Sequence, residues 1–147
     1  MKITLIDQKD LKFPDIFKNK KLKLAIVGSR KLNQKEVKEV IRIDILRFVI
    51  AKYMRDDVLI ISGGAKGVDT FAEEVAEELG IDVLVVKPNY KLYFPKAAPL
   101  ERNTTIVNFS NGMIAYFPEG ELTGGTKNVL EKFKEKSDKY MIRQINI

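Results

Sequence analysis

Three glycines and a lysine stand together where an apolar run gives way to a helical pattern. The stretch is SGGAKGVD, residues 62–69, and it follows the apolar residues VLII. A simple turn needs one or two glycines, whereas Gly63, Gly64 and Gly67 fall within five residues here. Bare backbone at the start of a helix, where N–H groups are unpaired, is typical of a site for phosphate or another anion. We therefore predict that a phosphate or a sugar lies against this backbone.

Three further loops have sequences of the same kind. They are GSRK at residues 28–31, PNYKLYFPKAAPLERN at residues 88–103 and PEGELTGGT at residues 118–126. Each alone could be an ordinary turn or helix start, but all four would lie at the carboxyl edge of one parallel sheet, where such sheets bind ligands. Glycine-rich helix starts and guanidinium groups together make an anion site. The predicted ligand-binding residues are Gly28, Ser29, Arg30, Gly63, Gly64, Ala65, Lys66, Gly67, Asp69, Arg102, Asn103, Gly124, Gly125 and Thr126.

The composition excludes several kinds of chemistry. The chain has no cysteine and no histidine, so it has no disulfide, thiolate nucleophile, Cys/His zinc site or Ser-His-Asp triad. Acid–base chemistry would fall to Asp, Glu, Lys or Tyr, and the candidates for catalysis are Asp69, Arg102 and Glu121. The glycine stretches fit neither the Walker A pattern nor G-x-G-x-x-G, which disfavours P-loop hydrolysis and nicotinamide-dependent dehydrogenation. We predict no metal site, and the sequence identifies no cofactor with certainty.

Length and charge bound the class of protein. The 147 residues are enough for one domain with a hydrophobic core. A net charge of +6 and a pI near 9.4 favour anionic partners such as nucleotides or nucleic acid. The alternative is that the charge only keeps the protein in solution. The sequence has no apolar run of about eighteen residues and no signal-peptide core, so we expect a cytoplasmic protein without a membrane partner.

Five apolar runs alternate with helical patterns. This βαβαβαβαβ order predicts a single Rossmann-like, doubly wound α/β domain over residues 22–147, with a mainly parallel five-stranded sheet and helices on both faces. The run at 139–145 alternates and is typical of an edge strand. Residues 1–21 form an N-terminal arm or an extra edge strand. We expect strands at residues 22–28, 58–64, 82–88, 112–118 and 139–145, and helices at residues 33–54, 68–80, 98–110 and 125–137.

The first helix has more apolar surface than a sheet-packed helix needs. Leu46, Ile50 and Met54 lie away from its main apolar stripe. This flank predicts a homodimer contact, or else it is covered by the N-terminal segment. Asp44 falls within the sheet-facing stripe, and we expect it to be a structural carboxylate with satisfied hydrogen bonds rather than a catalytic one.

The order of four motifs, VGSR, SGGAKGVDTFAEEVAEELGI, APLERN and GGTKNVL, resembles the SLOG superfamily. That superfamily takes in the DNA-processing protein DprA, the cytokinin-activating LOG enzymes and small YspA/YpsA-like proteins, and the resemblance is closest to the last group. It extends over residues 22–142. The resemblance implies a Rossmann-like fold that binds a nucleotide or nucleotide-derived ligand, such as AMP or ADP-ribose, across the loops named above.

Two branches of the superfamily provide alternatives to simple nucleotide binding. LOG enzymes are phosphoribohydrolases whose P-G-G-x-G-T-x-x-E motif supplies a glutamate. Here Lys127, Asn128 and Val129 follow Thr126, so that glutamate is missing, although Arg102 is a candidate for the LOG arginine.

DprA binds single-stranded DNA, and such binding commonly uses exposed aromatic side chains. Tyr90, Tyr93 and Phe94 form the aromatic cluster near the predicted site, where they pack the long loop or stack on a base. We therefore predict a nucleotide-binding module without turnover, with a LOG-like hydrolase and a DprA-like DNA-binding module as the alternatives.

Overall fold

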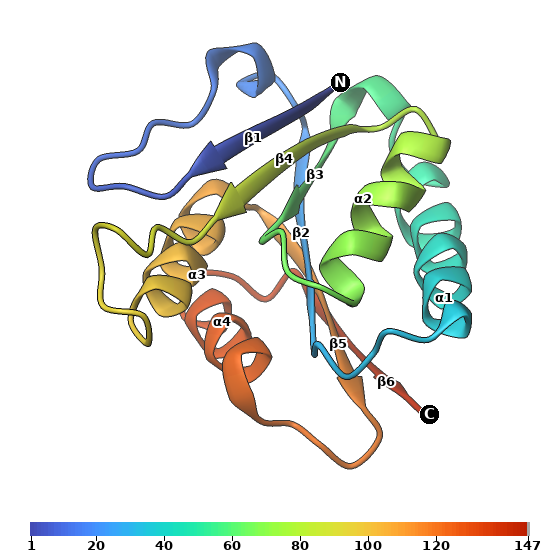
Figure 1. Cartoon of the computed structure of the whole chain (residues 1–147). Coiled ribbons are helices and arrows are strands. Elements are labelled where there is room, and N and C mark those ends of the chain that lie inside the picture. Colours follow the sequence, from blue (N-terminus) through green and yellow to red (C-terminus); the bar gives the residue numbers. More distant parts are fainter. Residues whose placement is uncertain (147) are drawn as a thin grey trace.

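The sheet has six strands that all run parallel (Figure 1). The computed structural model describes residues 1–146, so residue 147, the last of the predicted domain at 22–147, lies outside the described residues. The prediction of a parallel α/β sheet is confirmed, but the predicted number of five strands is wrong. In the order β1-β4-β3-β2-β5-β6, the strands are β1 (Lys2–Ile6), β4 (Asp82–Lys87), β3 (Val58–Ser62), β2 (Leu22–Gly28), β5 (Gly112–Pro118) and β6 (Tyr140–Ile145).

Helices cover both faces of this sheet. In Figure 1, α1 and α2 lie on one side and α3 and α4 on the other, which is the Rossmann-like arrangement that the sequence predicts. The helices of residues 1–146 are too short or too polar to cross a lipid bilayer. Their bounds are Lys35–Ile45 for α1, Val68–Glu78 for α2, Ala98–Phe109 for α3 and Gly124–Lys134 for α4.

The central strands are apolar throughout because both of their faces are buried. All five residues of β3 and all seven of β5 are buried. Successive side chains of a strand point to opposite faces. Leu24 and Ile26 of β2 therefore pack under α1 and α2, while Ala25 and Val27 pack under α3 and α4.

The sixth strand comes from the N-terminal residues, for which the sequence left two interpretations open. β1 pairs in parallel with β4, in a register that joins Lys2 to Val83 and Ile6 to Lys87. In the following segment, Phe17 is buried in the core under α3 and α4, and the partly buried Phe13 packs against that core. The N-terminal segment thus lies on the opposite face of the sheet from α1 and does not cover the apolar flank of that helix.

The first helix is shorter than the prediction of residues 33–54. After α1 the chain continues as a π-helix (η2, Leu46–Ile50), and Met54 lies beyond its end. Leu46 is 42% exposed and Met54 is 75% exposed, whereas Ile50 packs against the core. These residues therefore do not form one continuous helical flank, and the homodimer stays a prediction.

Asp44 is fully buried between α1 and the sheet, as the position of the residue in the helix predicts. The Tyr116 hydroxyl of β5 donates a hydrogen bond of 2.9 Å to its Oδ2, and the Arg143 guanidinium of β6 lies 3.1 Å from its Oδ1. Burial and the neighbouring Asp44 carboxylate raise the pKa of Tyr116. The hydroxyl therefore stays protonated and acts as the donor of this hydrogen bond. Asp44 therefore ties one helix to two strands.

Removal of the Tyr116 hydroxyl should destabilise the protein. Tyr116→Phe leaves a buried carboxylate oxygen without its donor, so we expect a loss of about 1–3 kcal/mol in the free energy of unfolding, measured by urea denaturation. The control is Tyr140→Phe on β6, where the side chain is 37% exposed and the loss should stay below about 0.5 kcal/mol. Equal losses in the two variants would contradict the stabilising role of the buried bond.

Candidate functional site

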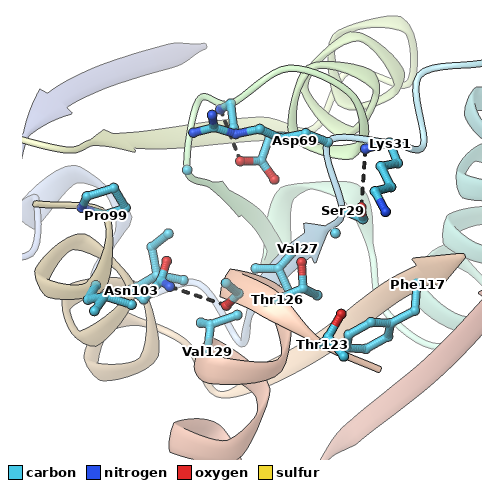
Figure 2. Close-up of a pocket in the computed structure, with 18 of the residues that line it drawn as sticks. Val27, Ser29, Lys31, Asp69, Pro99, Asn103, Phe117, Thr123, Thr126 and Val129 are labelled. Atoms are coloured by element: carbon cyan, nitrogen blue, oxygen red, sulfur yellow. Dashed lines mark hydrogen bonds between the residues drawn. The ribbon is translucent and has the colours of Figure 1, made fainter. Parts of the chain in front are cut away.

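A pocket of about 440 Å³ lies at the carboxyl ends of β2, β3 and β5 (Figure 2). From β2 the chain moves to β3 and β4 on one side, and it then returns to place β5 on the other side of β2. The pocket opens where the strand order reverses, which is the usual ligand position in open α/β sheets. Figure 2 shows Asp69 of α2, Asn103 of α3 and Thr126 of α4 around one hollow.

The four predicted loops meet at this pocket. Every predicted ligand-binding residue lines it except Gly64, Lys66 and Gly67. Gly64 and Gly67 have positive φ angles of 72° and 84° and turn the chain between β3 and α2. Lys66, at the tip of that turn, is exposed to solvent.

Three of the glycines are required by contacts within the protein. A Cβ atom on Gly28 would lie 2.4 Å from Cγ2 of Val68, and one on Gly67 would lie 3.1 Å from the Leu32 carbonyl oxygen. A Cβ on Gly63 would lie 2.7 Å from Nη1 of Arg102. The close approach that the glycines predict is therefore made by α2, by the β2–α1 loop and by Arg102.

A chain of hydrogen bonds joins the β3–α2 loop to the start of α4. Nη1 of Arg102 donates to the Gly63 carbonyl, and Nε donates to Oδ1 of Asn103 at 3.1 Å. Nδ2 of Asn103 then lies 3.4 Å from the Gly125 carbonyl oxygen and 3.4 Å from Oδ1 of Asn128. Since Arg102 and Asn103 are each only 7% exposed, these bonds fix the pocket wall.

Asp69 is a buried carboxyl group in the same wall. It is 7% exposed and its Oδ2 accepts a hydrogen bond of 3.1 Å from the Ala65 N–H. The N-cap of α2 is Gly67, two residues before Asp69. Burial raises the pKa of Asp69 to about 6, although the Ala65 N–H and the Arg102 charge oppose this shift. Burial also lowers the pKa of Arg102.

Two charged residues form an ion pair at the rim. Nζ of Lys31, in the β2–α1 loop, lies 3.3 Å from both carboxylate oxygens of Glu121 in the β5–α4 loop. Glu121 was a candidate for catalysis, and it lines the pocket with its charge directed to Lys31. Lys31 belongs to the predicted loop GSRK but was not among the predicted ligand-binding residues.

Other pocket residues were also absent from the prediction. The apolar floor consists of side chains at strand ends and on inward helix faces, which alternation along each element could have identified. Asp7, just beyond β1, was also absent from the prediction, although it does not line the pocket; it is 1% exposed and accepts a hydrogen bond of 2.6 Å from the Thr105 hydroxyl of α3. It was missed because β1 was not predicted with certainty. The floor residues are Val27, Ile106, Phe117 and Val129.

The aromatic residues of the β4–α3 loop lie outside the pocket lining. Tyr90 is 53% exposed and Phe94 is 86% exposed, so packing of the loop does not account for them. Lys91 and Lys96 of the same loop are exposed too. The loop therefore presents aromatic and basic side chains to solvent beside the site.

These features define a Rossmann-like domain with a pocket of mixed polar and apolar lining at the switch point of a parallel sheet. The family model for DNA recombination-mediator protein A matches residues 15–97, more than half of the chain, and the chain belongs to this family. The X-ray structure of DNA processing protein A (DprA) from Streptococcus pneumoniae is similar, with a TM-score of 0.52 and 18% sequence identity. That match covers 90% of this chain and 60% of the DprA chain, and it shows a shared fold. No curated protein matches the chain. Membership of the YspA-like group stays a prediction.

Two glycine substitutions should separate packing from open space. Gly28→Ala places a methyl group against Val68, so we expect a loss of about 1–3 kcal/mol in the free energy of unfolding. Gly125→Ala meets no atom within 4 Å and has no positive φ angle, so it should be neutral or stabilise by up to about 1 kcal/mol. Urea denaturation of both variants checks this contrast, and a stable Gly28→Ala protein would refute the tight packing.

Ionisation of Asp69 should weaken the fold. Because the pKa of Asp69 in the folded protein is about 6 and the ordinary value is 3.8, the unfolded chain ionises first as the pH rises. The contribution of the group to stability thus falls between pH 4 and pH 6, by roughly 3 kcal/mol in total. Asp69→Asn keeps an acceptor for Ala65 but does not titrate, so the variant should gain stability relative to the wild type across this range. Parallel unfolding curves at pH 4, 5, 6 and 7 measure the difference, and a constant difference would contradict the raised pKa.

Proposed function

We propose that the pocket binds a nucleotide or nucleotide-derived ligand, with the phosphate at the start of α4 and the sugar or base beside Arg102 and Asp69. The volume of about 440 Å³ falls within the range of small-molecule sites. The observation that carries the proposal is the convergence of an open helix start and a buried arginine on this one pocket.

The start of α4 has the properties of a phosphate site. Its N-cap residue, Thr123, makes no side-chain capping hydrogen bond, and Gly124 has a φ angle of 75°. No atom lies within 4 Å of where a Cβ of Gly125 would stand. The first N–H groups of a helix lack partners within the helix, and the helix dipole favours an anion there.

The opposite wall suits the rest of a nucleotide. One oxygen of Asp69 is held by Ala65, and Figure 2 shows the carboxyl group directed toward the hollow. A carboxylate in this position can accept a hydrogen bond from a sugar hydroxyl or a base amino group. The apolar floor formed by Val27, Phe117 and their neighbours provides a surface for a base or the carbon atoms of a sugar.

Single-stranded DNA is the second candidate ligand, and two observations favour it. The chain belongs to the family of DNA recombination-mediator protein A, and Tyr90 and Phe94 are exposed beside the pocket. Aromatic side chains next to basic ones bind single strands by stacking and charge attraction. In this case the pocket would take one nucleotide of the strand and the β4–α3 loop would contact its neighbours.

Nucleotide binding should raise the melting temperature. At a ligand concentration of about 100 times Kd, stabilisation of about 2.7 kcal/mol corresponds to roughly 5–10 °C in a chain of this size. A thermal-shift panel of AMP, ADP, ADP-ribose and cyclic nucleotides measures this effect against adenosine. Arg102→Ala should abolish the shift relative to its own unliganded protein, whereas Arg55→Ala, at the other edge of the sheet, should keep it.

A variant of the β4–α3 loop distinguishes the two candidate ligands. The double variant Tyr90→Ala/Phe94→Ala should bind AMP like the wild type but bind a short oligodeoxythymidylate several-fold more weakly if DNA is the ligand. Absence of any response to mononucleotides, with tight binding of the oligonucleotide, would refute the small-molecule proposal.

We also expect no N-glycosidic cleavage. Lys127, Asn128 and Val129 stand where LOG enzymes carry their glutamate, Glu121 is paired with Lys31, and the Asp69 carboxyl is buried. Chromatography after incubation of the protein with AMP should show no free adenine above the uncatalysed background. Release of adenine that stops in Asp69→Asn or Glu121→Gln would establish an enzyme instead.

A further inference from the structure

The ion pair between Lys31 and Glu121 spans the mouth of the pocket. β2 and β5 are neighbouring strands, with Gly28 in register with Tyr116, and the two loops that follow them carry the pair. Both side chains line the pocket, and Nζ of Lys31 lies 3.3 Å from each oxygen of Glu121. Glu121 stands three residues before Gly124, at the approach to the open start of α4. The Glu121 carboxylate therefore forms an ion pair with a cation, Lys31, that lines the same pocket as the proposed phosphate site.

The backbones of both residues are held by their own loops. The Lys31 N–H donates to Oγ of Ser29 at 3.2 Å, and the Lys31 carbonyl accepts from Nε2 of Gln34 at 3.2 Å. The Glu121 N–H donates to the Pro118 carbonyl at 3.0 Å. Separation of the pair thus requires a change of side-chain conformation alone.

The pair is weak enough for a ligand to replace. The Lys31 side chain is 68% exposed and that of Glu121 is 45% exposed. Exposed ion pairs contribute roughly 0–1 kcal/mol, because water screens the charges. A phosphomonoester brings up to two negative charges and three oxygens to the ammonium group, where a carboxylate brings one charge.

From this geometry we infer that Lys31 is a phosphate-binding residue and that Glu121 holds it when no ligand is bound, as a competing anion that the ligand must displace. The inference rests on the proposed function and adds regulation of the same site by a contact within the protein. Glu121 then sets the affinity for anionic ligands without touching them.

A simple structural role of the pair leads to a different expectation. If Lys31 and Glu121 only held two loops together, the loss of either charge would loosen the pocket and lower the affinity. The competing-anion role makes Glu121→Gln bind phosphate ligands more tightly and Lys31→Gln bind them more weakly. The two roles thus differ in the sign of the effect at Glu121.

Isothermal titration with AMP, and with adenosine as the uncharged probe, tests the inference. Glu121→Gln should raise the affinity for AMP by about two- to fivefold and leave that for adenosine unchanged. Glu119→Gln is the matched control, since Glu119 is an exposed carboxylate of the same loop that does not line the pocket. It should change the affinity for AMP much less. In Lys31→Gln, which should itself bind AMP more weakly, the additional change Glu121→Gln should give a clearly smaller gain.

The outcomes distinguish this inference from the proposed function. AMP binding by the wild type, with no gain in Glu121→Gln or an equal gain in Glu119→Gln, overturns the inference and leaves the proposed function in place. A gain of the same size with or without Lys31 also overturns it, because Glu121 would then act by general repulsion. AMP binding by Glu121→Gln alone supports the inference and shows that the pair keeps the wild-type pocket closed to this ligand. Absence of AMP binding in all variants overturns both.

Discussion

The geometry of the site depends on the hydrogen bonds that the buried guanidinium of Arg102 donates. This group brings a charge from α3 against the β3–α2 loop through the Gly63 carbonyl, and through Asn103 it reaches the start of α4. The approach is so close that only glycine fits at position 63 without displacement of the arginine. Arg102 therefore fixes the distance between two glycine-rich loops that belong to different strands, and the pocket is the space that remains between them.

A second constraint sets the place of α2. The helix starts where Val68 packs directly on the backbone of Gly28, so the β2 and β3 loops have to leave the sheet side by side. This contact directs the start of α2, and with it Asp69, toward the pocket. Other close contacts account for glycines within residues 62–69, since Gly63 lies against Arg102 and Gly67 against the β2–α1 loop. The glycines of this stretch contact other parts of the protein, and the backbone that is open to a ligand lies mainly at Gly125.

The sequence predicts the parallel sheet and its helices well because each buried strand has a continuous apolar run. Each loop whose residues could bind a ligand follows such a run. β1 was uncertain because it is a five-residue edge strand with alternating exposure, and Asp7 was lost with it. The end of α1 was placed too far along because apolar residues continue through η2, whereas the helix geometry changes at Leu46. The contacts that explain Gly28 and Gly63 join residues far apart in the chain, such as Gly63 with Arg102, and spacing along the sequence cannot reveal them.

The two charged groups of the buried wall, Asp69 and Arg102, are both largely removed from solvent. Burial raises the pKa of Asp69 to about 6 and lowers the pKa of Arg102, so water stabilises neither ionised form as it would on the surface. Their mutual attraction offsets only part of this cost, since burial remains the largest influence on each. A ligand that brings hydrogen-bond acceptors of its sugar or base near the guanidinium and a hydroxyl or amino donor to the carboxylate supplies what water does not. A nucleotide carries both kinds of group at a separation of a few bonds. The unfavourable electrostatics of the wall thus favour the proposed ligand, whether as a free molecule or as one unit of a strand.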